Sequence, residues 1–215
     1  MAHRTRIKIC GLTRAEDVDA AVAAGVDAVG FNFYERSTRF VSVAHAHDLA
    51  RRLPAFVTPI GLFVNADPAR INEAIAQVPH LVLQFHGDET VAACEAPARP
   101  YLRAARVRPG FDLVDFAANY ASAQAILLDA HVEGYGGGGK VFDWSLIPST
   151  VRRPVVLSGG LHAGNVAEGI RRVRPWAVDV SSGVESAKGI KDAAAIRRFC
   201  TAVREADARA EADPA

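Results

Sequence analysis

Short apolar runs recur along the chain, and most of them are followed by a segment whose apolar residues repeat with helical spacing. The apolar runs predict eight strands, at 6–10, 27–33, 57–64, 81–85, 101–107, 125–129, 154–158 and 176–180. The segments between them predict helices at 15–24, 43–53, 89–95, 111–120, 163–173 and 192–205, one beginning at Asp67-Pro68, and a short one at 144–147.

The strand ends are spaced by about 20 to 30 residues, which is the length of one β-α unit. The strands are continuous apolar runs rather than alternating ones, as is typical of a parallel sheet that is covered on both faces. Eight such units predict an α/β protein with a (β/α)8 TIM barrel fold, formed by a single domain over 1–205. The polar tail at 206–215 is expected to be frayed. The alternative is an open doubly wound sheet, which usually needs fewer units.

Composition narrows the class of protein. The 215 residues are enough for one full-sized core, and the formal net charge of +1 gives no field that favours nucleic acid or a membrane surface. Three widely spaced cysteines are too few for a disulfide framework and suit a reducing compartment. No apolar run approaches a membrane span, and the N-terminus does not resemble a signal peptide. We therefore expect a soluble cytoplasmic protein with no nucleic-acid or membrane partner.

Active sites of such barrels lie at the C-terminal ends of the strands. Glycines and serines follow the seventh and eighth predicted strands, and backbone N–H groups of such loops can approach an anion closely. These residues predict a phosphate site after strands seven and eight, formed by Gly159, Gly160, Ser181, Ser182 and Gly183.

Two further strand ends carry groups suited to proton transfer. Cys10 ends the first strand and Asp129 ends the sixth, whereas Cys94 and Cys200 fall on predicted helices and suit a structural role. Lys8 lies on the same side of its strand as Cys10, and it either favours the thiolate or pairs with Asp179 on the neighbouring strand. A thiolate base and a carboxylic acid across one pocket can isomerise an aldose derivative without metal or cofactor.

Two tempting motifs are set aside. The run 134–139 matches G-x-G-x-x-G formally, but it neither follows a strand directly nor opens a clear helix, so we expect a lid rather than a dinucleotide site. Of the histidines, His86 is expected in the pocket together with Gln84, and a metal site with Asp129 and His131 is disfavoured. We predict no metal and no cofactor.

An ordered series of motifs resembles the N-(5′-phosphoribosyl)anthranilate isomerase family of tryptophan biosynthesis. It comprises Lys8–Thr13, Gly30-Phe31 with Ser37–Arg39, Gly61–Asn65, Leu83–Gly87, Leu128-Asp129, Tyr135–Gly137 with Gly139-Lys140 and Phe142–Trp144, Leu157–Leu161 and Val178–Glu185. The resemblance covers essentially the whole chain except the tail. One departure is Gly138, where serine or threonine is expected, and it puts no catalytic role in doubt.

The resemblance implies a cofactor-independent intramolecular oxidoreductase of the aldose–ketose type. It implies that Cys10 is the general base, that Asp129 is the general acid, and that Arg39 holds the anthranilate carboxylate. Gln84, His86 and Asp179 complete the expected substrate-binding set. The implied reaction is the Amadori rearrangement of N-(5-phosphoribosyl)anthranilate to 1-(2-carboxyphenylamino)-1-deoxyribulose 5-phosphate. A monomer is expected, with a homodimer as the alternative.

Two other functions stay open at this point. One is another phosphosugar barrel, such as a metal-dependent epimerase or a lyase similar to indole-glycerol-phosphate synthase. The other is a non-catalytic phosphosugar-binding protein on the same scaffold, which the presence of both Cys10 and Asp129 disfavours.

Overall fold

Eight parallel strands close into a barrel in the order of the sequence, which confirms the predicted (β/α)8 fold. The structure, a computed structural model, describes residues 4–130 and 143–212. The strands are β1 Arg6–Cys10, β2 Ala28–Asn32, β3 Thr58–Phe63, β4 Val82–Phe85, β5 Tyr101–Val107, β6 Ala125–Ala130, β7 Val155–Leu157 and β8 Ala177–Val180. Closure is made by β1 and β8, where Lys8 lies opposite Asp179.

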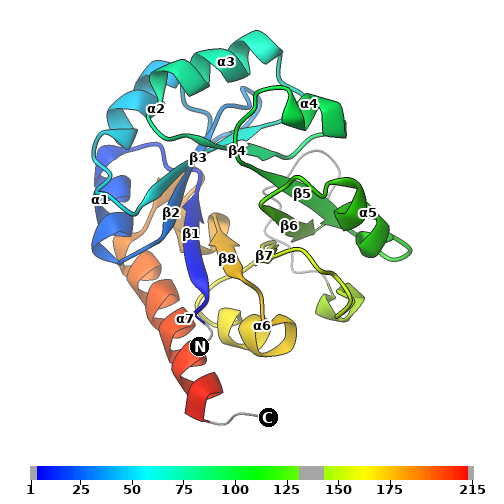
Figure 1. Ribbon diagram of the computed structural model, residues 1–215. Helices are drawn as coiled ribbons and strands as arrows, with labels where there is room; N and C mark the ends of the chain where they lie inside the picture. Colours follow the sequence, from blue (N-terminus) through cyan, green and yellow to red (C-terminus); the bar gives the residue numbers. More distant parts are fainter. Residues whose placement is uncertain (1–3, 131–142, 213–215) are drawn as a thin grey trace.

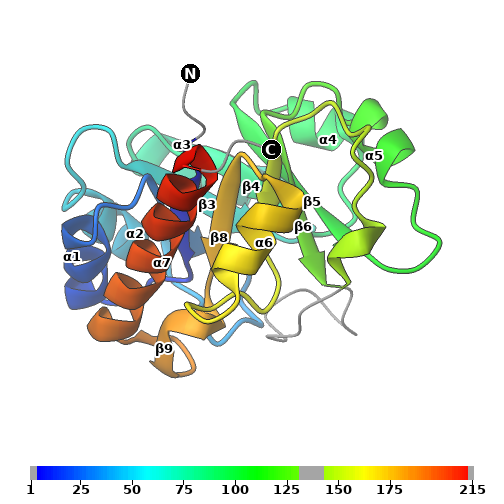
Figure 2. The same cartoon turned by 90° about the horizontal axis from the view of Figure 1, so that it is seen from below.

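Helices surround the barrel (Figure 1). They are α1 Ala15–Ala23, α2 Val43–Ala50, α3 Pro68–Gln77, α4 Val91–Glu95, α5 Leu113–Asn119, α6 Val166–Val173 and α7 Ala193–Ala212, with short 3-10 helices η1 Trp144–Leu146 and η2 Ser182–Val184. Figure 2 shows α7 running between α1 and α6. Local signals set the helix starts: the side chain of Asp67, for example, caps α3 by accepting from the backbone N–H of Ala69.

Side chains alternate along each strand between the barrel interior and the surrounding helices. The residues that pack toward the helices form the large core, which includes Ile9, Phe31 and Leu128. A smaller apolar cluster fills the lower barrel, and it contains Ile60, Leu102, Ala104, Ala125, Leu127, Val156 and Ala177. The interior positions nearer the C-terminal strand ends are largely polar, so this alternation delivers the functional side chains to one mouth.

Two features differ from the expected elements. Between β8 and α7 the chain forms a small antiparallel hairpin, β9 Glu185–Ala187 and β10 Ile190–Lys191, which the sequence did not predict. The last helix does not end at 205 but continues to Ala212, so most of the expected frayed tail is helical. This extension is held by Asp207, whose carboxylate accepts from the backbone N–H and the hydroxyl of Thr5 at 2.8 and 2.7 Å.

Two further expectations concern the predicted lid with His131 and the absence of a membrane span. The predicted lid at 134–139 and the side chain of His131 lie outside the described residues. Among the helices of the described residues, none combines the length and apolar character of a membrane span.

Candidate active site

One pocket lies at the C-terminal ends of the strands and gathers residues from the ends of β1–β4 and β6–β8. It is lined by Cys10, Gly11, Asn32, Tyr34, Ser37, Arg39, Leu62, Val64, Gln84, His86, Asp129, Ser158, Gly159, Gly160, Leu161, Asp179, Val180, Ser181 and Ser182. Every site residue expected from the sequence is in this lining except Gly183. The topology alone explains this convergence, because parallel strands present their C-terminal ends at the same mouth.

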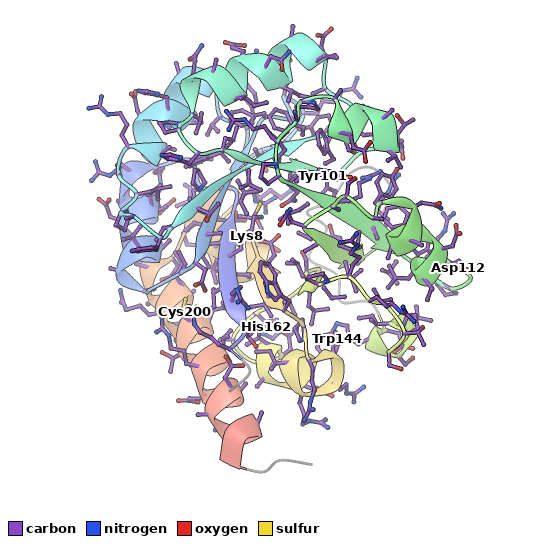
Figure 3. The ribbon with its side chains drawn as sticks, viewed as in Figure 1. Lys8, Tyr101, Asp112, Trp144, His162 and Cys200 are labelled. Carbon is purple, nitrogen blue, oxygen red and sulfur yellow. The ribbon has the colours of Figure 1, made fainter. Side chains whose placement is uncertain are left out.

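Cys10 lies beside a buried ion pair. Lys8 Nζ donates to Asp179 Oδ1 at 3.0 Å, and both side chains are less than a tenth exposed. Lys8 lies near the centre of the molecule (Figure 3). A Cβ at Gly30 would come within 2.8 Å of Cys10 Sγ and 3.1 Å of Lys8 Nζ, so glycine leaves the room that both groups occupy. Both roles considered for Lys8 are observed, since it pairs with Asp179 and its charge also lowers the pKa of the neighbouring thiol.

Burial dominates the acidity of the thiol. Desolvation raises the pKa of Cys10, and the positive charge of Lys8 opposes that rise only in part. Burial by itself would lower the pKa of Lys8, but the charges and hydrogen bonds of Asp179 and Cys10 together outweigh it and leave that pKa raised. The free protein therefore holds Cys10 mainly as a thiol beside a lysine that stays protonated. Burial also raises the pKa of Cys94 to about 12 and that of Cys200 to about 11.

Asp129 ends a row of three polar side chains across the pocket. Gln84 Nε2 lies 3.3 Å from His86 Nδ1, and His86 Nε2 lies 3.2 Å from Asp129 Oδ2. An amide N–H that donates to Nδ1 leaves the ring proton on Nε2, where it points at the carboxylate. The other oxygen of Asp129 accepts from the backbone N–H of Ala130 at 2.9 Å. The carboxyl group is thus fixed in orientation at the end of β6.

The loops after β7 and β8 form the expected glycine-serine cradle. Gly159 and Gly160 have φ values of +81° and +64°, a region that glycine adopts without strain. Asn165 Nδ2 donates to the carbonyl of Gly160 at 3.0 Å and fixes this turn ahead of α6. Gly183 lies behind the lining, where a Cβ would come within 1.9 Å of the carbonyl oxygen of Leu161. It permits close contact between the two loops.

Arg39 approaches the pocket from the loop between β2 and α2. Its Nε and Nη2 donate to the two carboxylate oxygens of Glu185 at 2.7 and 2.8 Å. Lys191 Nζ lies 2.8 Å from the same carboxylate. Sequence reasoning identified Arg39 but missed Glu185 as its partner and Lys191 altogether. The partners are far apart in the chain, and only the Lys188-Gly189 pair, a turn signal, pointed to the hairpin that carries them.

Among the described residues, no group of three or more His, Cys, Asp or Glu side chains is placed to hold a metal ion. What the pocket offers is a thiol, an oriented carboxyl group, an arginine and two loops with backbone N–H groups. This arrangement is typical of (β/α)8-barrel enzymes that act on small phosphorylated molecules.

Comparison with known proteins specifies the family. The sequence profile described as N-(5'phosphoribosyl)anthranilate (PRA) isomerase matches residues 7–202. N-(5'-phosphoribosyl)anthranilate isomerases from Leptothrix cholodnii and Methylibium petroleiphilum are 75% and 74% identical, over 96% and 97% of this chain and 94% and 98% of their own. The chain therefore belongs to the phosphoribosylanthranilate isomerase family.

Solved structures agree with this assignment. Phosphoribosyl anthranilate isomerase from Thermotoga maritima superposes with a TM-score of 0.86 at 42% identity, covering 94% of this chain and 99% of its own. A structure of the same enzyme class, in complex with reduced 1-(o-carboxyphenylamino)-1-deoxyribulose 5-phosphate, has a TM-score of 0.83 at 40% identity with the same coverage.

Proposed function

We propose that this protein catalyses the Amadori rearrangement of N-(5-phosphoribosyl)anthranilate to 1-(2-carboxyphenylamino)-1-deoxyribulose 5-phosphate, a step of L-tryptophan biosynthesis. The observation that carries the proposal is the presence of Cys10 and Asp129 at the ends of β1 and β6 on one pocket. The resulting enzyme is a cofactor-independent isomerase of the aldose–ketose type. The substrate is a small phosphosugar joined to an aromatic acid, and no metal takes part.

The first step opens the ribose ring. The aniline nitrogen lone pair forms a double bond to C1′ while the bond from C1′ to the ring oxygen breaks. Asp129 gives its proton to that oxygen, leaving a protonated Schiff base and a carboxylate. His86 holds the carboxyl group through the 3.2 Å contact, and the backbone N–H of Ala130 holds its other oxygen. Ring opening therefore needs no reorientation of the acid.

The second step moves a proton between carbons. The thiolate of Cys10 removes the C2′ proton, and the electrons form a C1′=C2′ bond and neutralise the Schiff base. The enolamine then takes a proton at C1′ from the thiol and loses its C2′ hydroxyl proton to the Asp129 carboxylate. Both groups return to their starting forms, so the reaction is an isomerisation with no net proton change.

The anionic ends of the substrate have separate sites in this proposal. The phosphate lies against Gly159, Gly160, Ser181 and Ser182, with Gly183 shaping the loop behind them. The carboxylate lies on Arg39, and Gln84, His86 and Asp179 border the ribose. The positive φ values of Gly159 and Gly160 support the phosphate position, because turns of this kind can present successive backbone N–H groups to an anion.

The test is a fluorescence assay with freshly formed phosphoribosylanthranilate on the wild type, Cys10→Ala and Asp129→Asn. Removing either group is expected to lower kcat by about 10²–10⁴-fold. Cys200→Ala and Asp115→Asn are matched controls, since Cys200 is buried away from the pocket and Asp115 is exposed on α5. Near wild-type kcat in either test variant would refute that residue's role. Loss of activity with EDTA would favour a metal-dependent epimerase.

The proposal extends to the state of the protein in the cell. A monomer is expected, with the homodimer as the alternative, since a Thermotoga maritima relative is described as dimeric. Light scattering at the working concentration separates the two. A cytoplasmic location is supported by Cys10, Cys94 and Cys200, which are all free thiols.

A further inference from the structure

A buried cluster of charges joins the arginine of the site to the loop after β8. Glu185 and Lys191 lie on the hairpin β9–β10, and their side chains are 5% and 0% exposed. The carboxylate of Glu185 accepts hydrogen bonds from both Arg39 and Lys191. Lys191 Nζ also donates to the carbonyl oxygen and hydroxyl of Ser181 at 3.1 and 3.3 Å. One hairpin thus touches both places where the substrate's two anionic groups are proposed to lie.

The edge of Arg39 that Glu185 uses is informative. A guanidinium has one edge formed by Nε and Nη2 and another formed by Nη1 and Nη2, and each can bind a carboxylate through two parallel bonds. Among the described residues, the hydrogen bonds from the Arg39 guanidinium all use the Nε edge and all reach Glu185. Because Glu185 holds the Nε edge, it also sets the direction of the Nη1/Nη2 edge, which is available to a ligand carboxylate. Glu185 determines which way the arginine faces.

The hairpin is fixed on its outer side as well. Thr13 Oγ1 donates to the carbonyl of Gly189 at 2.7 Å, and the backbone N–H of Lys191 donates to Asp17 Oδ2 at 3.2 Å. Gly189 has a φ of +80°, and a Cβ there would come within 3.0 Å of the carbonyl oxygen of Thr38. The hairpin therefore packs directly against the segment that carries Arg39.

A contribution to folding stability does not by itself explain why these three charges are buried together. Burying ion pairs costs much of the solvation of each charge, and well-packed apolar residues often serve as well. Burial by itself would raise the pKa of Glu185, but hydrogen bonds and charge from Arg39 and Lys191 outweigh it and lower that pKa. Burial lowers the pKa of Lys191, and the carboxylate of Glu185 opposes that change. With Lys191 protonated, the cluster of Arg39, Glu185 and Lys191 carries one net positive charge beside a pocket that must accept an anionic substrate.

We propose that the hairpin Glu185–Lys191 is a positioning unit: Glu185 orients Arg39 for the substrate carboxylate, and Lys191 supports the Ser181 loop for the phosphate. Neither residue touches substrate. The inference rests on the proposed function, because it assigns the supports of the two anion sites named there.

The first test keeps the negative charge at position 185 and moves the carboxylate away from Arg39. Glu185→Asp retains a carboxylate but shortens the side chain by one methylene, so charge effects stay constant while the orientation of Arg39 is lost. Calorimetry gives the Kd of two ligands, the reduced product analogue with its ring carboxylate and the same compound with a plain phenyl ring. The preference for the carboxylated ligand should fall about tenfold in Glu185→Asp, the value of one lost charge-assisted hydrogen bond. Glu168→Asp is the matched control, since Glu168 forms an exposed pair with Arg172.

Two further measurements separate positioning from a structural role. In Glu185→Asp the KM for phosphoribosylanthranilate should rise about tenfold while kcat stays within about threefold, because Arg39 acts in binding rather than in proton transfer. Lys191→Met should weaken the Kd for inorganic phosphate about tenfold, with the carboxylate preference of the two ligands retained.

Several results would overturn the inference. An unchanged carboxylate preference in folded Glu185→Asp, or an unchanged phosphate Kd in Lys191→Met, would remove the corresponding assignment. If neither Glu185→Asp nor Glu185→Gln folds by circular dichroism, the cluster is structural and the proposal fails. A wild type that neither converts phosphoribosylanthranilate nor prefers the carboxylated ligand would instead refute the proposed function.

Discussion

Lys8→Met tests the electrostatic design of the barrel centre. The change removes one member of a pair whose charged atoms lie 3.0 Å apart with side chains 4% and 7% exposed. At an effective dielectric constant of 20 the lost attraction is about 5 kcal/mol, and breaking a buried pair costs about 3–5 kcal/mol in practice. We expect the free energy of unfolding to fall by that amount, because Asp179 keeps its burial and loses its partner.

The assay is urea unfolding followed by circular dichroism, with thermal unfolding as a second measure. For a chain of this length a loss of about 3–5 kcal/mol corresponds to a Tm lower by about 6–20 °C. The control is Lys8→Met combined with Asp179→Leu, which replaces both charges by apolar groups and should recover most of the stability. Arg172→Met, which removes an exposed partner of Glu168, should change stability by less than about 1 kcal/mol.

Lys8→Met has a second expected effect, on Cys10. The Lys8 charge opposes the rise that burial causes in the pKa of the thiol, so removing it should raise that pKa further. Alkylation of Cys10 by iodoacetamide should then require a higher pH than in the wild type. A Tm within about 2 °C of the wild type, or a double variant as unstable as the single one, would refute the reasoning.

Three further results are expected. Because burial raises the pKa of Cys10, less thiolate exists at a given pH, so the rate of Cys10 alkylation by iodoacetamide should keep rising with pH beyond the ordinary thiol value of about 8.5; a plateau near pH 7 would contradict this. His86→Leu should lower kcat about tenfold by freeing the Asp129 carboxyl group, with KM little changed, and an unchanged kcat would exclude the orienting role. Gly159→Ala should lower kcat/KM at least about tenfold, because the φ of +81° costs about 1–3 kcal/mol and the new Cβ would lie 3.0 Å from Asp129 Oδ1; wild-type kinetics would show that the loop yields.

The barrel was predictable because its signals are local. Each strand is an apolar run bounded by turns or polar residues, and β1 and β5 have the predicted bounds. The hairpin β9–β10 was missed because its strands are very short and polar, so neither length nor hydrophobic pattern separates them from a loop. The end of α7 was placed too early, because its last turns are polar and depend on a contact between Asp207 and Thr5 at the start of the chain.

The candidate site likewise contains residues that the sequence could predict and contacts that it could not. Cys10 and Asp129 could be chosen from the sequence because each ends a strand, and the fold brings all strand ends to one mouth. His86 was expected in the pocket, but its contact with Asp129 and the contact of Glu185 with Arg39 could not be predicted, since each joins distant segments. The Arg39–Glu185 pair joins residues 146 apart in the chain. The balance at Cys10 could not be predicted either, because burial raises the pKa of the thiol by more than the charge of Lys8 lowers it.

The raised pKa of Cys10 bears on when the thiolate base forms. Lys8, Arg39 and Lys191 surround Cys10 with three cations, but Asp179 and Glu185 neutralise two of them. The remaining positive charge does not overcome desolvation, so the thiol predominates in the free protein. In the proposed reaction, ring opening at Asp129 creates a positive charge on the Schiff base nitrogen next to C2′. A positive charge close to the thiol favours the thiolate form of Cys10. Protonation of the ring oxygen by Asp129 therefore promotes removal of the C2′ proton by Cys10. The order of the two proton transfers then follows from the charges of the pocket.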